Sequence, residues 1–110
     1  MKKIEWSHTL LEGQFVSLTE AEAAVAELGP DWRLPTVDEL QTILDRSRYD
    51  PAIDTDKFPD TKSLPYWTST PLAWDSKSRW LVSFNLGIVI DVNFYSACVR
   101  ACREVEEEGR

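Results

Sequence analysis

The residues of this chain that could perform covalent chemistry are few, and their spacing argues against it. The two cysteines, Cys98 and Cys102, lie four positions apart in a stretch that is typical of a strand. A strand would separate their Cα atoms by ~13 Å, whereas a disulfide needs less than ~7 Å. The single histidine, His8, lies far from both in the sequence, so a paired Cys–His nucleophile has little support. We therefore expect two reduced thiols and no enzymatic activity.

Carboxylates are more abundant, but their pattern does not predict a metal site. Four aspartates, Asp50, Asp54, Asp56 and Asp60, fall in the proline-containing stretch 49–65. Calcium takes about six to eight oxygen ligands, and this spacing matches no compact calcium-binding loop. The chain also lacks a glycine-rich loop of the kind that binds phosphate. The sequence predicts no metal, no cofactor and no catalytic residue.

The formal net charge of −7 restricts the partners that the chain can bind. Proteins that bind nucleic acid neutralise its phosphates with clustered Lys and Arg, so we expect no direct contact with DNA or RNA. A protein partner with a basic surface is compatible with the charge. The oligomeric state stays open at this point.

The first residues decide the expected location. Residues 1–3, Met-Lys-Lys, are followed by Glu5, Ser7 and His8 instead of an apolar run, and no long apolar stretch occurs later. A secretory signal and a membrane-spanning helix both need such a run. We expect a cytoplasmic protein without membrane contact, which also suits the reduced thiols.

Length and composition suit a single domain. The chain has 110 residues, of which 43% are apolar, enough to fill one compact core. We place the domain at residues 1–105 and an acidic tail at residues 106–110.

Two capping-box patterns predict two helices. Thr19 followed by Glu22 predicts a helix from Glu20 to Leu28, and Gly29-Pro30 ends it. Thr36 followed by Glu39 predicts a second helix. Its expected apolar stripe is Leu40, Ile43 and Leu44, and it ends in the polar run before Pro51.

The remaining elements are strands and loops. Tyr66–Thr70 has the composition of a strand, and residues 79–103 have room for two or three more. Lys3–Trp6 and Gln14–Val16 are shorter candidate strands. Residues 49–65 and 71–78 are predicted loops.

A hairpin around Gly87 can be given a register. A three-residue turn over residues 85–87 would pair Phe84 with Ile88, Val82 with Ile90 and Trp80 with Val92, all apolar and facing inward. The other face would then be mixed and partly polar. It would hold Leu81, Ser83 and Asn85 opposite Val89, Asp91 and Asn93.

Several motifs give the chain a family resemblance. The segment 32–40, Trp-Arg-Leu-Pro-Thr-Val-Asp-Glu-Leu, resembles a signature shared by formylglycine-generating-enzyme-like domains and by the Lcl C-terminal domain family of bacteria and phages. Segments 47–54, 58–60, 66–71 and 99–101 look like the Lcl C-terminal family in the same order. The resemblance covers residues 14–103.

This resemblance implies a C-type-lectin-like α+β fold. Two helices would pack on a small twisted, mainly antiparallel sheet with long loops, which matches the element order predicted above. The formylglycine-generating relatives use a cysteine pair for catalysis, and Cys98 and Cys102 fall at other positions. The resemblance therefore implies a fold and no enzymatic activity.

Aromatic residues divide into core and surface. We assign Trp32, Trp67 and Trp80 to the core, and Arg33 to a structural pairing with a nearby carboxylate or with carbonyl groups. Trp74, Phe94 and Tyr95 stand at predicted turns, where they either fold back as a lid on the core or anchor a partner. The predicted partner-binding surface comprises Trp74, Asp75, Val89, Asp91, Asn93, Phe94 and Tyr95.

These observations favour a non-catalytic protein-binding module, associated with a phage or prophage. One alternative is a phage-encoded inhibitor that places an acidic surface against a basic, nucleic-acid-binding host defence complex. A second alternative is recognition of a glycan or receptor, as in an adhesin or a tail component.

Overall fold

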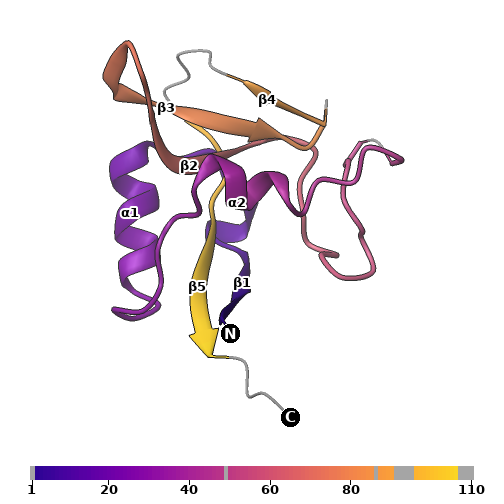
Figure 1. Ribbon diagram of the computed structural model, residues 1–110, viewed down its shortest axis with the longest axis horizontal. Coiled ribbons are helices and arrows are strands. Elements are labelled where there is room, and N and C mark those ends of the chain that lie inside the picture. Colours follow the sequence, from indigo (N-terminus) through magenta and orange to yellow (C-terminus); the bar gives the residue numbers. More distant parts are fainter. Residues whose placement is uncertain (1, 49, 86, 91–95, 107–110) are drawn as a thin grey trace.

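The chain folds into an α+β structure, as predicted. The computed structural model describes residues 2–48, 50–85, 87–90 and 96–106. Figure 1 shows two helices beside two small sheets. The elements in order are β1 (Lys2–Thr9), the 3-10 helix η1 (Leu11–Gly13), α1 (Leu18–Ala26), α2 (Val37–Gln41), β2 (Pro65–Leu72), β3 (Asp75–Ser83), β4 (Ile88–Ile90) and β5 (Arg100–Glu106).

The first helix, α1, begins two residues earlier than predicted. Ser17 and Glu20 form its capping box, so the predicted pairing of Thr19 with Glu22 is wrong. Both patterns satisfy the capping rule, and a long-range contact selects between them. Val16 pairs with Ala97, which holds the chain extended up to Ser17. The earlier start also places Ala21 and Val25 in the core.

The second helix, α2, has the predicted capping box of Thr36 and Glu39. It ends at Gln41, earlier than its apolar stripe suggested. Leu44 forms an isolated bridge with Ile53, and the Asp45 N–H donates to the Ala52 carbonyl at 2.8 Å. This pairing with a distant segment draws the chain out of the helix. Leu40 is fully buried, and Ile43 and Leu44 pack beside the core.

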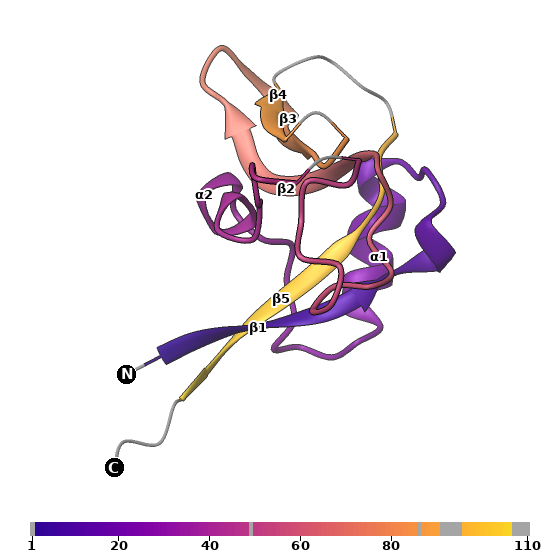
Figure 2. The ribbon, with the colours of Figure 1, turned by 90° about the vertical axis from the view of Figure 1, so that its right-hand side faces the viewer.

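The strands form two antiparallel sheets that run in different directions in Figures 1 and 2. One sheet pairs β1 with β5, and the other has the order β2-β3-β4. A parallel bridge joins Tyr66 of β2 to Cys98, which lies two residues before β5. The candidate strand at Lys3–Trp6 is therefore part of β1, whereas Gln14–Val16 contributes only the Val16 bridge.

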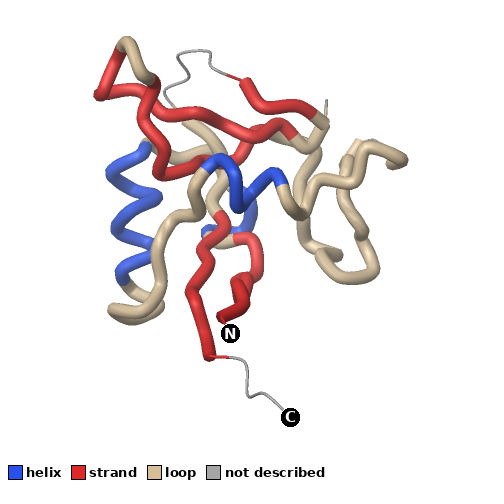
Figure 3. Tube along the Cα trace, in the orientation of Figure 1, coloured by secondary structure: helices blue, strands red, loops and turns tan. Residues whose placement is uncertain are grey.

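The segment 71–78 is mostly strand, so its assignment as a loop was wrong (Figure 3). β2 continues to Leu72 and β3 begins at Asp75, which leaves only Ala73 and Trp74 between them. The loop was predicted because Pro71 lacks the backbone N–H that a strand residue donates to its neighbour. At the edge position of β2 that donor is not needed, and the ladder shifts register around Pro71 instead.

The hairpin register differs by one residue from the prediction. Ser83 pairs with Ile88, Val82 with Val89 and Leu81 with Ile90, so the loop has four residues. Gly87 adopts a φ of 71° and its N–H donates to the Ser83 carbonyl at 2.8 Å, which supplies the left-handed turn that was expected of it.

Residues 81–83 of β3 are buried on both faces, and this explains the register error. Leu81 packs in a core cluster with α1, and Val82 and Phe84 pack in a second cluster with α2. The prediction assumed one buried and one outer face, so apolar alternation could not select the register. Val89 packs against the second cluster and is not on an outer face, whereas Ile88 is 44% exposed.

This register gives a direct stability test. Phe84 is fully buried and contacts the Tyr66 ring edge-on, so we expect Phe84→Ala to lower the free energy of unfolding by ~3–5 kcal/mol. Ile88→Ala should change it by less than about 1 kcal/mol, because the side chain is exposed. Urea unfolding of both variants decides the point. A loss of 2 kcal/mol or more for Ile88→Ala, roughly the range for a buried isoleucine, would restore the predicted register.

Candidate functional site

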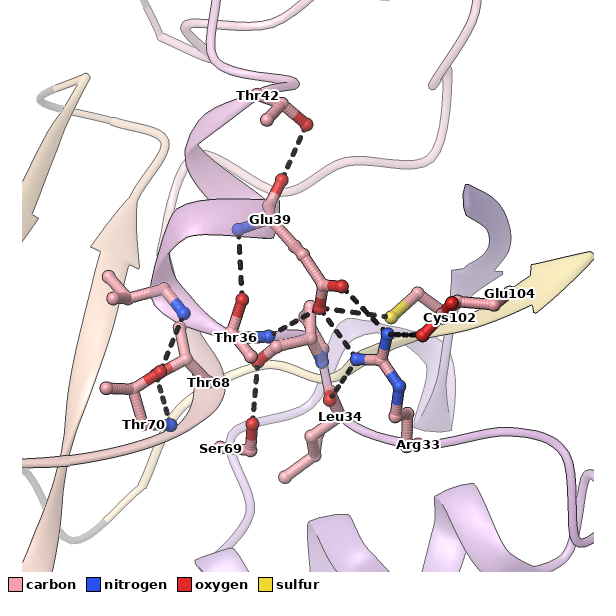
Figure 4. A network of polar contacts seen from close by, with 12 residues as sticks. Arg33, Leu34, Thr36, Glu39, Thr42, Thr68, Ser69, Thr70, Cys102 and Glu104 are labelled. Atoms are coloured by element: carbon pink, nitrogen blue, oxygen red, sulfur yellow. Dashed lines mark hydrogen bonds and ion pairs between the residues drawn. The ribbon is translucent and has the colours of Figure 1, made fainter. Parts of the chain in front are cut away.

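The Arg33-to-Glu39 motif forms a closed polar network at the start of α2 (Figure 4). Arg33 Nη1 and Nη2 donate to the two carboxylate oxygens of Glu39 at 2.6 and 2.7 Å. Glu39 also accepts the Thr36 N–H at 2.9 Å, which completes the capping box. The structural role predicted for Arg33, pairing with a local carboxylate, is confirmed.

This network also holds the neighbouring strands. Arg33 and Cys102 exchange backbone hydrogen bonds of 2.9 Å in both directions, which ties the motif to β5. The Ser69 N–H donates to the Pro35 carbonyl at 2.8 Å, and the Val37 N–H donates to Thr70 Oγ1 at 2.9 Å. The motif therefore joins α2 to both sheets.

The Arg33–Glu39 pair changes the acidity of its members. The hydrogen bonds from Arg33 lower the pKa of Glu39 from 4.5 to about 2, although partial burial opposes the shift. The same hydrogen bonds raise the pKa of Arg33. Both groups are therefore charged across the physiological range.

A second network surrounds Arg100, the first residue of β5. Its side chain is 2% exposed. The guanidinium carbon lies 5.1 Å from the centroid of the Phe58 ring and 6.0 Å from that of Tyr66. The guanidinium nitrogens donate to the Ser7 carbonyl (2.6 Å), Thr9 Oγ1 (3.0 Å), Asp60 Oδ1 (3.1 Å) and Thr61 Oγ1 (2.8 Å).

Asp60 is the counter-ion of Arg100. It also accepts the Thr9 N–H at 2.7 Å. Burial opposes its ionisation, but the Thr9 N–H and the Arg100 charge outweigh burial and lower the pKa of Asp60. One member of the aspartate-rich loop thus has a structural role. Within the described ranges, no three His, Cys, Asp or Glu side chains are placed to hold a metal ion.

A polar cavity of about 440 Å³ lies beside the Arg100 network. Three of its lining residues, Thr9, Asp60 and Thr61, already bind Arg100. The stem of Lys62 passes close to Gly13, leaving no room there for a Cβ atom. Glu12 and Lys62 also line this cavity.

The two thiols are free and buried, as expected of reduced cysteines. Burial raises the pKa of Cys98 to about 11 and that of Cys102 to about 12. Cys98 Sγ donates to the Gly13 carbonyl at 3.3 Å, and Cys102 Sγ lies 3.8 Å from Glu39 Oε1. A thiol with a raised pKa and no access to solvent is a poor nucleophile.

The predicted core tryptophans differ in burial. Trp67 is 5% exposed, and its Nε1 donates to the Val16 carbonyl at 2.9 Å. Trp32 packs half-buried against the first core cluster, with Arg103 4.7 Å from its ring centroid. Trp80 is half-buried in β3. Only Trp67 belongs fully to the core.

Trp74 is the predicted partner-binding residue that the structure exposes most clearly. It stands between β2 and β3 with 67% of its surface exposed. Its ring lies edge-on to Trp80 at a centroid distance of 6.0 Å. The alternative, that Trp74 folds back as a lid on the core, is wrong. We call residues 72–75, with Trp74 at their centre, the hairpin tip.

Of the other predicted site residues, Asp75 and Val89 lie within the described ranges. Asp75 is the first residue of β3, and its side chain is not described. Val89 is partly buried and packs against the second core cluster. The remaining four lie outside the described residues, namely Asp91, Asn93, Phe94 and Tyr95.

A groove that the sequence did not suggest lies between α1 and the segment 32–34. Its volume is about 340 Å³. Its lining comes from three separate segments, so no local pattern could reveal it. The lining residues are Glu22, Val25, Ala26, Trp32, Arg33, Leu34 and Ser69.

Comparison with known families decides the relationship. The family description that fits the chain is the Lcl C-terminal domain, which matches residues 1–103, nearly the whole length. The chain belongs to the Lcl C-terminal domain family. No curated protein matches the sequence. The family predicted from the motifs is confirmed, while the relation to C-type lectins stays a prediction.

In this Lcl C-terminal domain the motif residues are engaged in structural contacts. Arg33 and Glu39 bind each other, Arg100 joins β5 to β1, and Trp67 bonds to the segment before α1. Neither described helix has the length and apolar character that a membrane crossing requires.

Acidification should remove the contribution of Glu39 to stability. Its pKa is depressed in the folded state, so the contribution is complete above pH 4.5 and is lost as the pH falls through about 2. We expect Glu39→Gln to lower the free energy of unfolding by roughly 1–3 kcal/mol at neutral pH. The difference from wild type should shrink steadily below pH 4.5, as measured by urea unfolding. A difference that stays constant down to the folded-state value of about 2 would contradict the assigned ion pair.

Proposed function

We propose that this domain is a non-catalytic protein-binding module that contacts its partner through the hairpin tip. The observation that carries the proposal is the 67% exposure of Trp74. Tryptophan is enriched among the residues that dominate protein interfaces, and a turn between two strands presents it without disturbing a core.

The energy available at the tip is sufficient for a binding anchor. A tryptophan buries ~150–250 Å² when fully covered. The exposed two thirds of Trp74 would therefore contribute roughly 2.5–4 kcal/mol on contact with a partner. Trp80 supports the ring edge-on, so less side-chain freedom is lost on binding.

The thiols and the polar networks support binding over catalysis. The two cysteines are buried, and burial raises the pKa of both thiols. The most buried cation, Arg100, is bound by four protein oxygens. These groups stabilise the fold, so we expect a partner to bind to exposed side chains.

The charge of the chain favours a partner with a basic surface. A net charge of −7 steers such a partner toward the domain and opposes binding to acidic surfaces. A host complex that binds nucleic acid presents such a surface, so this observation favours an inhibitor as the second candidate function.

Alanine substitution at the tip tests the proposal. The immobilised domain is used to capture its partner from extracts of the organism that encodes it, and the affinity of the purified partner is then measured. We expect Trp74→Ala to weaken binding by about 30-fold or more, equivalent to ~2 kcal/mol, with an unchanged melting temperature.

Phe15→Ala is the matched control for this experiment. Phe15 is an aromatic residue with 47% exposure that lies outside the hairpin, between η1 and α1. Its removal should leave the affinity unchanged. Equal binding by wild type and Trp74→Ala would refute the proposal, and so would unfolding of Trp74→Ala.

A further inference from the structure

We infer that the groove between α1 and the segment 32–34 binds an arginine side chain of the partner. The inference rests on the proposed function and adds the chemistry of a second contact. Three features carry it, namely an apolar floor, an indole wall and an excess of carboxylate around the opening.

The floor of the groove suits the methylene stem of a long side chain. Val25 and Leu34 are 4% and 6% exposed, so they form part of the core that the groove reaches. Ala26 adds a small side chain on the α1 side. An arginine can bury its methylene groups on such a surface while its guanidinium stays near the opening.

The wall of the groove suits a planar cation. Trp32 lines the groove and is half-buried, so its ring is held in place. The same indole already carries one guanidinium, that of Arg103, at 4.7 Å from its centroid. Arg103 does not line the groove and is paired with Glu5, so the part of the indole that borders the groove stays available. Stacking on an indole favours arginine over lysine.

The charge around the opening suits a cation. Arg33 lines the groove, but Glu39 binds it at 2.6 Å and Glu104 lies 3.5 Å from it. Glu22 adds a third carboxylate from the exposed face of α1. No ion pair between described residues involves Glu22. Glu39 balances the charge of Arg33, so the carboxylate of Glu22 leaves the opening negative and complementary to a further cation.

The groove lies within reach of the hairpin tip along β2. Ser69 of β2 lines the groove, and Trp74 follows five residues later, at most ~17 Å along an extended chain. One partner can therefore cover the tip and place an arginine in the groove.

Short peptides test the groove without the partner. The probe is acetyl-Gly-Arg-Gly-amide, and the same peptide with citrulline removes the charge but keeps the shape. Titration of the labelled domain by NMR should show saturable shifts at Glu22, Val25 and the Trp32 indole N–H. The citrulline peptide should bind at least about five-fold more weakly, because it lacks the charge.

Two glutamates of α1 and its C-cap provide the matched variants. Glu22→Gln removes the groove carboxylate and should weaken the arginine peptide by about five-fold or more. Glu27→Gln removes the same charge from the C-cap of α1, outside the groove lining, and should have no effect. Equal loss in both variants, equal binding of arginine and citrulline peptides, or an absence of shifts at the groove would each overturn the inference. Equal affinity for a lysine peptide would overturn the choice of arginine.

The outcome is separable from that of the proposed function. Trp74→Ala should bind the arginine peptide as wild type does, because Trp74 does not line the groove. If the peptide fails to bind while Trp74→Ala still loses the partner, only the groove is wrong. If the peptide binds in the groove while Trp74→Ala keeps the partner, only the hairpin tip is wrong.

Discussion

The burial of the Arg100 guanidinium is the constraint on which most of this structure depends. Removing an ion from water costs several kcal/mol, so a buried cation must be matched by well-placed acceptors. Arg100 finds them on segments far apart in the sequence. Ser7 and Thr9 come from β1, and Asp60 and Thr61 come from the long loop before β2. The loop is therefore held against the first and last strands, although it has little regular structure of its own.

The second constraint is the Arg33–Glu39 pair, in which a cation is again matched by well-placed acceptors, here at the surface of α2. The helix has only five residues and would not persist alone. Its capping box, the two hydrogen bonds from Arg33 and the contacts to β2 hold it in place.

Short sequence patterns predicted the structure correctly where interactions between residues close in the sequence determine it. The Thr36 capping box, the left-handed Gly87 and the structural role of Arg33 were predicted correctly. The predictions were wrong where contacts between distant segments determine the structure. The bridge between Val16 and Ala97 makes α1 begin earlier than predicted. Burial on both faces near the end of β3 hid the observed hairpin register, which differs from the predicted one by one residue. The acceptors of Arg100 and the groove come from separated segments, so no spacing pattern could reveal them. The position of Trp74 at a turn was predicted from the local sequence, whereas its role in binding stays a prediction.

The stability of Arg100→Met tests this account most directly. Methionine keeps much of the length and removes the charge, which leaves Asp60 and the β1 acceptors without their donor. We expect a loss of ~3–5 kcal/mol in the free energy of unfolding by urea denaturation. Arg48→Met is the control, since Arg48 is 43% exposed and its ion pairs of 3.4 and 3.6 Å should contribute less than about 1 kcal/mol. A loss for Arg100→Met no larger than that for Arg48→Met would contradict the central role of the buried guanidinium.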